Sequence, residues 1–263
     1  MKADYKNWVP KGMIYGLAAG TAVLGAGFVS SMILTKDASI PIRIGLNSVL
    51  GLATLACAKG TQWSLFAYDQ FSYDGKRKLS KQIIEGVAKY VSIPDGGTGL
   101  DVGCGSGALT IACAKRNPGA KMLGIDRWGK EYASFSKQLC ENNSRAEDVE
   151  NTSFKQGDAR FLDFENESFD AVTSNYVFHN ISGFNKQELL LETLRVLKKG
   201  GTFAIHDIMS KSRYGDMNAF VKKLKDMGYE EVMLIHTDDG LLMSKKEGKK
   251  LGLSGSMILT GRK

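Results

Sequence analysis

Proline, cysteine and histidine are scarce in this sequence of 263 residues. Four Pro stand against 30 Gly, so the chain is neither a proline-rich linker protein nor a collagen. The four Cys (Cys57, Cys104, Cys113 and Cys140) include no CxxC pair and no Cys/His spacing of a zinc site. We therefore expect reduced thiols in a cytosolic setting and no metal centre. The hydrophobic share of 43% excludes general disorder.

Charge is missing from one long stretch near the start of the chain. Residues 12–34 carry no charged side chain, and as a helix they extend about 34 Å, enough to cross a hydrocarbon core of about 30 Å. A short polar break, residues 35–39, leads to a second apolar stretch at residues 40–58, with Arg43 near its start and Lys59 just past its end. These features predict a hairpin of two hydrophobic helices, within a region that we place at residues 1–68.

Four interpretations of this hairpin remain open at this point. We favour a two-span membrane anchor over a cleaved signal peptide, a hairpin lying on the membrane surface, and a soluble hairpin that packs on the domain or forms an oligomer. Gly12, Gly16 and Gly20 recur at every fourth residue, a pattern that lets helices approach closely in lipid or in a homo-oligomer. Small residues on the second stretch are suitable partners, namely Ala53, Ala56, Cys57 and Gly60.

The net charge of +7 is concentrated at the two ends of the chain. Residues 1–68 carry a net charge of +4 and residues 181–263 carry +5, whereas residues 69–180 carry −2. Lysines precede the first apolar stretch, basic residues follow the second, and the connecting loop is neutral. The positive-inside rule then predicts that both ends, and the rest of the chain, lie in the cytoplasm.

From residue 69 to residue 263 the pattern alternates between short β-rich runs and amphipathic runs. We expect strands at 98–102, 121–125, 152–156, 169–174, 201–206, 230–235 and 256–261. We expect helices at 79–91, 107–116, 129–143, 186–198 and 216–227. This alternation predicts an α/β fold with a doubly wound, Rossmann-like sheet of seven strands.

Polar and glycine-rich motifs follow the first four strands, where an open α/β sheet binds its ligands. The first is Leu-Asp-Val-Gly-Cys-Gly-Ser-Gly at residues 100–107, in which the acid would repel a pyrophosphate but suits a cationic ligand. Gly-Ile-Asp ends the second strand at Asp126, and a carboxylate there can accept both hydroxyls of a ribose. Gln-Gly-Asp-Ala ends the third at residues 156–159, and Ser174-Asn175 ends the fourth.

These motifs, in this order and spacing, resemble those of the class I S-adenosylmethionine-dependent methyltransferases, in particular the small-molecule branch. The resemblance covers residues 72–263 and includes the run Leu194 to Gly201, although Lys199 stands where the family usually has proline. It implies S-adenosylmethionine as cofactor. The residues that it implies for cofactor binding are Tyr73 as a flap, Asp101, Gly103, Gly105, Gly107, Asp126, Arg127, Asp158, Ala159, Ser174 and Asn175.

A general base is expected just after the fourth strand. His179 follows that strand closely and its ordinary pKa of about 6.5 suits proton abstraction, although a structural role is nearly as well supported. His206 and Asp207 end the fifth strand at the same edge, and we expect one of them to point into the site, with Asp207 able to orient a cation or a hydroxyl. His236, after the sixth strand, is a weaker candidate.

The predicted function is methyl transfer to a small lipophilic acceptor at the cytoplasmic face of a membrane. A nucleic-acid substrate is not expected, because residues 174–177 lack the prolines of a DNA amino-methyltransferase motif and no RNA-binding domain is appended. Two alternatives remain: a soluble oligomeric methyltransferase of a water-soluble metabolite, with residues 12–58 as the interface, and a non-catalytic cofactor-binding scaffold. Since the motifs begin at residue 98, we expect a chain without residues 1–60 to bind the cofactor.

Overall fold

The computed structural model describes residues 2–129 and 134–263, which form two compact units. One unit, within residues 7–80, is a hairpin of two long helices. The other contains residues 81–263 together with residues 2–6. The structure therefore differs from the expected boundary at residue 68, because it groups the first residues of the chain with the second unit.

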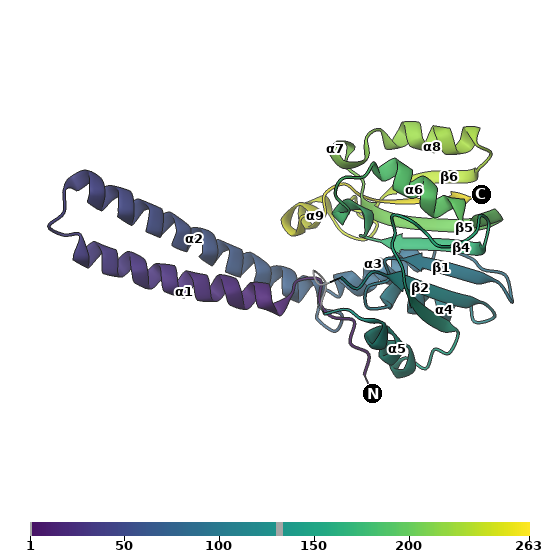
Figure 1. Ribbon diagram of the computed structural model, residues 1–263, viewed down its shortest axis with the longest axis horizontal. Coiled ribbons are helices and arrows are strands. Elements are labelled where there is room, and N and C mark those ends of the chain that lie inside the picture. Colours follow the sequence, from purple (N-terminus) through teal and green to yellow (C-terminus); the bar gives the residue numbers. More distant parts are fainter. Residues whose placement is uncertain (1, 130–133) are drawn as a thin grey trace. The chain divides into compact units, whose positions relative to one another are not determined.

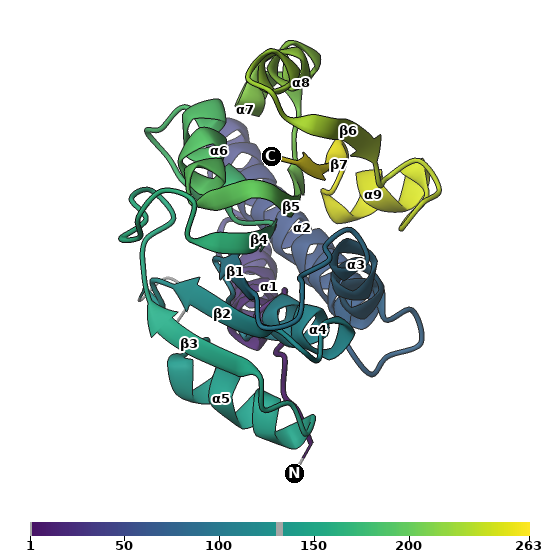
Figure 2. The ribbon, with the colours of Figure 1, turned by 90° about the vertical axis from the view of Figure 1, so that its right-hand side faces the viewer.

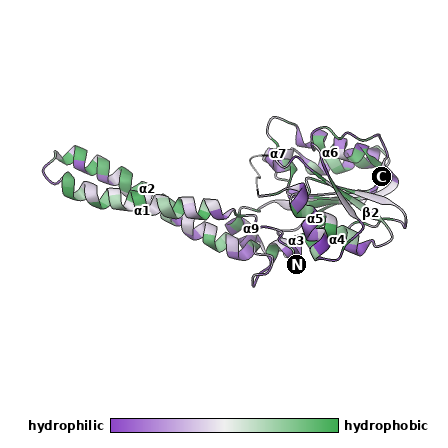
Figure 3. Ribbon diagram, turned by 60° about the horizontal axis from the view of Figure 1, so that its bottom comes forward, coloured by the Kyte–Doolittle hydropathy of each residue, from purple (hydrophilic) through white to green (hydrophobic). Residues whose placement is uncertain are grey.

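The hairpin consists of α1 (Lys11–Leu34) and α2 (Ile40–Phe71), which run side by side in Figure 1. Both helices are long and apolar enough to cross a membrane, and 6% and 0% of their most apolar windows are buried within the chain. Figure 3 shows apolar residues over much of both helices and polar residues at the loop that joins them. Helix α2 is longer than the expected 40–58, because its helical pattern continues past Lys59 to Phe71.

Small residues and one polar pair form the contacts between α1 and α2. A Cβ at Gly20 would lie 3.4 Å from Cys57 Sγ, and a Cβ at Gly60 would lie 3.3 Å from Leu17. The Ser31 hydroxyl pairs with the Asn47 side chain across the hairpin. By contrast, a Cβ added at Gly12 or Gly16 would have no described neighbouring atom within 4 Å. Among the three spaced glycines, Gly20 is therefore the one that packs against α2.

The second unit contains the expected seven-stranded sheet in the order β3-β2-β1-β4-β5-β7-β6. The strands are β1 (Thr98–Val102), β2 (Lys121–Asp126), β3 (Thr152–Gln156), β4 (Phe169–Asn175), β5 (Leu197–Ile208), β6 (Glu230–His236) and β7 (Ser256–Arg262). β1 to β5 are parallel, whereas β7 is antiparallel to both β5 and β6. The carboxyl ends of β1 to β5 therefore meet at one edge of the sheet, where the predicted motifs lie.

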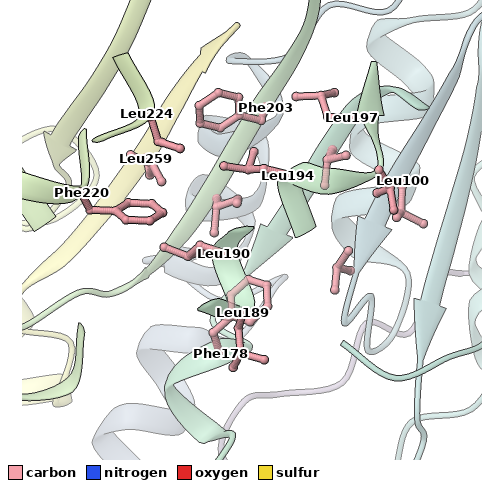
Figure 4. Packing of buried hydrophobic residues seen from close by; sticks show 14 of the residues in the cluster. Leu100, Phe178, Leu189, Leu190, Leu194, Leu197, Phe203, Phe220, Leu224 and Leu259 are labelled. Atoms are coloured by element: carbon pink, nitrogen blue, oxygen red, sulfur yellow. The ribbon is translucent and has the colours of Figure 1, made fainter. Parts of the chain in front are cut away.

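Helices cover both faces of this sheet. Those of the second unit are α4 (Ala108–Arg116), α5 (Lys137–Ala146), α6 (Lys186–Arg195), α7 (Lys211–Tyr214), α8 (Met217–Asp226) and α9 (Lys245–Leu251), and α3 (Leu79–Ala88) leads into it. Figure 2 shows α4 and α5 on one face and α6 and α8 on the other. The core between β1, β4, β5, α6 and α8 consists of fully buried leucines and phenylalanines, such as Leu100, Leu194 and Phe203 (Figure 4).

Several expected segments differ from the structure. The fifth strand begins at Leu197, within the expected helix at 186–198, and ends at Ile208 instead of residue 206. A helix at 129–143 was expected; residues 130–133 lie outside the described residues, and helix α5 begins at Lys137 and continues to Ala146. No helix was expected between residues 227 and 256, but the basic stretch at 245–250 forms α9. Ser244 and Glu247 make a reciprocal capping box at its start, and Gly252 ends it in the left-handed conformation with a φ of 73°.

Candidate active site

The glycine-rich loop after β1 has a backbone that few other residues could adopt. Gly103, Gly105 and Gly107 have φ values of +74°, +55° and +81°. A Cβ at Gly103 would lie 2.4 Å from Val177, and one at Gly107 would lie 3.1 Å from Phe154. A Cβ at Gly105 would come no closer than 3.8 Å to a described atom, a ring carbon of Phe135. A side chain at Gly105 would therefore make ordinary contact with the Phe135 ring, and the positive φ of Gly105 is what favours glycine at this position.

Asp126, at the end of β2, holds this loop through backbone hydrogen bonds. Its Oδ2 accepts from the Gly105 amide at 2.9 Å, and its Oδ1 accepts from the Trp128 amide at 2.8 Å. The Trp128 indole donates to the Gly105 carbonyl at 3.0 Å. Each carboxylate oxygen of Asp126 retains a lone pair, so it can still accept from a hydroxyl group. The neighbouring Arg127 is exposed.

Asp101 lies beneath the loop, with 1% of its surface exposed. It accepts hydrogen bonds from the hydroxyls of Thr110 at 2.7 Å and Thr173 at 3.0 Å, which tie β1 to α4 and β4. Burial raises the pKa of Asp101 to about 6, although the two threonines act in the opposite direction. Its expected contact with a ligand ammonium stays a prediction.

Asp158, after β3, is paired with a residue that the sequence analysis did not single out. The Arg160 guanidinium donates to both oxygens of Asp158, with Nε–O distances of 2.9 and 3.0 Å, and lowers the pKa of this carboxyl. An adenine amine would share this carboxylate with Arg160. Arg160 also lies over the ring of Phe184, 5.7 Å from its centroid. Ala159, the other expected residue in this segment, is half-buried against the core.

Phe161 and Phe184 are two further residues that the sequence analysis missed. Their rings meet edge to face at 6.0 Å, yet 68% and 37% of their surfaces are exposed. Lys186, 9% exposed, fixes the segment that carries Phe184 by donating to the carbonyls of Ile181 and Phe184. Aromatic residues directly after the motif at 156–159 were the available sequence signal.

The end of β4 is fixed by buried hydrogen bonds. Ser174 is fully buried, and its hydroxyl donates to the Val102 carbonyl at 2.8 Å. Asn175 Oδ1 lies 2.7 Å from His206 Nδ1, and His206 Nε2 lies 2.8 Å from the Thr237 hydroxyl. Burial lowers the pKa of His206 to about 4, so the ring is neutral at physiological pH. Because an amide oxygen only accepts, Nδ1 carries the proton in this arrangement.

His179 and Asp207 meet on the other side of β5. His179 lies in a short 3₁₀ turn, η2 (Phe178–Asn180), with its Nδ1 2.5 Å from Asp207 Oδ1, and its amide donates to Asp207 Oδ2 at 3.1 Å. Asp207 is fully buried, and burial alone would raise its pKa, but His179 and the Ile208 amide hold it below the ordinary value. Burial and the charge of Asp207 raise the pKa of the nearby Tyr214 phenol.

This pair leaves one ring nitrogen of His179 available. An ionised Asp207 accepts the Nδ1 proton, so the neutral imidazole presents Nε2 as a proton acceptor. The His179 side chain is 15% exposed, so the ring is partly accessible. The geometry is that of a general base oriented by a buried carboxylate.

Two other expected residues lie apart from this pair. His236 is exposed, and its Nδ1 is 3.7 Å from Asp238. Tyr73 is half-buried in the segment between α2 and α3, within the hairpin unit. Its expected role as a flap stays a prediction. In the part of the chain that the structure describes, no three His, Cys, Asp or Glu side chains gather as a metal site.

Comparison with known proteins gives consistent results. A sequence model of a family described as "methyltransferase domain" matches residues 93–249, more than half of the chain. Demethylmenaquinone methyltransferases from Lactobacillus johnsonii and Staphylococcus aureus are 34% and 36% identical over 118 and 117 residues, or 44% of this chain. The chain spans 46% and 44% of the lengths of these curated relatives.

Solved structures share the fold at low sequence identity. A geranyl diphosphate methyltransferase in complex with S-adenosylmethionine has a TM-score of 0.53 and 13% identity, covering 77% of this chain and 90% of its own. The cyclase SpnF also has a TM-score of 0.53, with 18% identity, and covers 70% of this chain and 81% of its own. At sequence identities this low, the structural likeness shows the fold alone.

Proposed function

The chain belongs to the methyltransferase-domain family, and from that premise we propose that it methylates a small lipophilic acceptor bearing an acidic hydroxyl, such as a hydroquinone, at the cytoplasmic face of a membrane. The protein is a methyltransferase that uses S-adenosylmethionine. The acceptor, the location and the residue roles are our proposal. The contact between His179 and Asp207 is the observation that carries it.

The residues around the glycine-rich loop fit the cofactor. The glycine-rich backbone at residues 103–107 accommodates the methionine part, and the lone pairs of Asp126 accept the ribose hydroxyls. Asp158 and the amide of Ala159 bind the adenine, beside Arg160. When bound, S-adenosylmethionine supplies an electrophilic methyl group on a sulfonium centre. The protein contributes alignment, exclusion of water and a base.

His179 activates the acceptor by removing a proton. The acceptor O–H bond breaks, the proton moves to His179 Nε2, and the electron pair stays on the acceptor oxygen. Asp207 stabilises the imidazolium that results, because its carboxylate is already in place at Nδ1. The phenolate, through its oxygen or a conjugated ring carbon, would then bond to the methyl group as the sulfur–methyl bond of S-adenosylmethionine breaks, and the electron pair would leave on the sulfur of S-adenosylhomocysteine. On the carbon route, the ring C–H proton would then be lost to restore the aromatic ring.

Two observations support a lipophilic acceptor. The relatives from Lactobacillus johnsonii and Staphylococcus aureus act, by name, on demethylmenaquinone, a lipophilic quinone. The exposed rings of Phe161 and Phe184 follow β3 and η2 at the carboxyl edge of the sheet, where they offer apolar surface to an acceptor.

The hairpin supports a membrane location. Both of its helices expose large apolar side chains, including Val23, Leu34, Leu52 and Leu55, with 58–82% of their surfaces accessible. Such surface is stable in lipid and unfavourable in water. Lysines flank α1 at its N-terminal side, and basic residues follow the apolar part of α2, so both ends of the hairpin are expected on the cytoplasmic side.

The test uses the full chain in phospholipid nanodiscs with labelled S-adenosylmethionine. The two acceptors are 1,4-naphthohydroquinone and reduced demethylmenaquinone with a short prenyl tail, under anaerobic conditions. We expect a methylated product by mass spectrometry with both, and a lower KM for the prenylated acceptor. Cofactor binding without transfer to either hydroquinone would contradict the proposed acceptor class.

A further inference from the structure

Residues 2–6 precede the hairpin in the chain but belong to the second unit, which contains the sheet. We call them the N-terminal strap. Tyr5 in this strap is 7% exposed, and Lys6 has a φ of 56° with its amide donating to Asp4 Oδ1 at 3.1 Å. The strap thus has a defined turn and one buried side chain, whereas an unattached terminus would have neither.

A single buried side chain joins the strap to the glycine-rich loop. Asn143, in α5, is 2% exposed. Its Oδ1 accepts from the Asp4 amide at 2.7 Å, and its Nδ2 donates to the carbonyls of Asp4 at 3.0 Å and Ser106 at 2.9 Å. Both amide protons and the amide oxygen are therefore used, and only one of the two flips of the side chain satisfies all three partners.

Ser106 lies between the two glycines that complete the loop, and it is 7% exposed. Other contacts hold Gly105, through Asp126, Trp128 and Cys140 Sγ, which lies 3.2 Å from the Gly105 carbonyl. Without the strap, the amide of Asn143 would lose two of its three partners and gain rotational freedom. The Ser106 carbonyl would then lose its fixed donor, and the loop would have to be ordered when the ligand binds.

We propose that the N-terminal strap is part of the cofactor site and that Asn143 is a positioning residue that transmits its order to the glycine-rich loop. The proposal rests on the assignment of this loop to S-adenosylmethionine. It differs from the expectation that residues 1–60 are dispensable for cofactor binding, because the strap lies within that range.

The test measures S-adenosylmethionine affinity by calorimetry on the full chain in detergent micelles. Three variants remove the connection in different ways: deletion of residues 2–6, Asp4→Pro, which removes the amide that donates to Asn143, and Asn143→Ala. Each is expected to raise Kd about tenfold, the effect of about 1.4 kcal/mol. Without cofactor, the amides of residues 105–107 should exchange faster with solvent in each variant, a change that general destabilisation elsewhere would not confine to this loop.

Asn142→Ala is the matched control. Asn142 neighbours Asn143, but its Oδ1 accepts from Gln138 and Arg145 on the surface of α5, so Kd should stay within twofold of the parent value. Asp126→Ala distinguishes failure of the strap proposal from failure of the cofactor-site assignment. If Asp126→Ala weakens binding while the strap deletion and Asp4→Pro leave Kd unchanged, the strap proposal is wrong. If all of them, including Asp126→Ala, leave Kd unchanged, the loop is not the cofactor site. Should Asn143→Ala fail to fold, the other two variants carry the test.

Discussion

In the proposed mechanism, His179 and Asp207 divide two tasks that one residue cannot perform together. The base must reach the acceptor, so His179 keeps part of its ring exposed, while the group that orients it must stay charged, so Asp207 is buried among donors. Both residues could be named from the sequence, His179 as following the fourth strand and Asp207 as lying at the end of the fifth. Their pairing could not, because it depends on the turn at η2, which brings residues 28 positions apart into contact.

Replacing Asp207 should slow methyl transfer without weakening cofactor binding. Asp207→Asn can donate to Nδ1, which favours the tautomer with the proton on Nε2, and both it and His179→Gln should lower kcat by about a hundredfold or more. Calorimetry should show cofactor affinity close to that of the parent. His236→Gln, at an exposed histidine, should keep parental turnover. If both Asp207→Asn and His179→Gln keep a near-parental kcat, His179 is not a base. Catalysis then depends only on the alignment of acceptor and cofactor.

Replacing Phe161 or Phe184 should weaken acceptor binding and leave cofactor binding unchanged. In Phe161→Ala and Phe184→Ala, loss of exposed ring area should raise the KM for a prenylated hydroquinone about three- to tenfold, since burying an apolar side chain contributes about 1.5–3 kcal/mol when complete. The KM for a hydroquinone without a tail should change little, and Phe→Leu should restore most of the difference. Equal effects on both acceptors would assign the pair a structural role instead.

Asp101 should make stability depend on pH in an unusual direction. Its pKa is raised from 3.8 to about 6, so between these values the folded chain holds a proton that the unfolded chain releases. Stability from this group is present below about pH 4 and is lost as pH rises to about 6, by at most about 3 kcal/mol. Urea unfolding in micelles should therefore show that Asp101→Asn gains stability relative to the parent across this window. A constant difference between the two proteins would mean that Asp101 titrates normally.

At the scale of elements, the strands were predicted most accurately. Buried parallel strands are short apolar runs bounded by glycine and polar residues, and those signals place β1 at the expected residues. The edge strand β3, in which only Phe154 is buried, also lies at its expected residues. Helices were less certain where local signals are weak. Seven residues with four lysines were not expected to form a helix, yet the cap at Ser244 and Glu247 is sufficient to start α9. The pairing of Asp158 with Arg160 was not predicted, because the motif at 156–159 ends before Arg160.

The hairpin offers a comparison between two glycines on one helix. Gly20 packs on Cys57 and Gly16 faces no described atom, so Gly20→Ile should force α1 and α2 apart while Gly16→Ile leaves their contact intact. Thermal unfolding in micelles should show the larger loss for Gly20→Ile. If Gly16→Ile instead changes only the oligomeric state, measured by light scattering, the exposed glycine face is where copies of the chain associate.

At the scale of the whole molecule, the hairpin should decide where the protein is found. The full chain should stay with membranes after an alkaline carbonate wash and should require detergent for extraction, because its apolar helices are exposed. A chain that lacks residues 1–60 should appear in the soluble fraction and bind S-adenosylmethionine more weakly, by the same factor as deletion of the strap. Release of the full chain by carbonate, as a soluble oligomer, would favour the interface interpretation of residues 12–58.

The hydrogen bond between Asp4 and Asn143 also has a consequence for synthesis. It closes a loop of 139 residues, so its first partner leaves the ribosome long before its second. At about 5–20 residues per second, roughly ten seconds separate the two. Both hairpin helices emerge within that interval. If the hairpin inserts into a membrane as proposed, the chain meets the bilayer before the strap is complete, and it gains full cofactor affinity only after insertion.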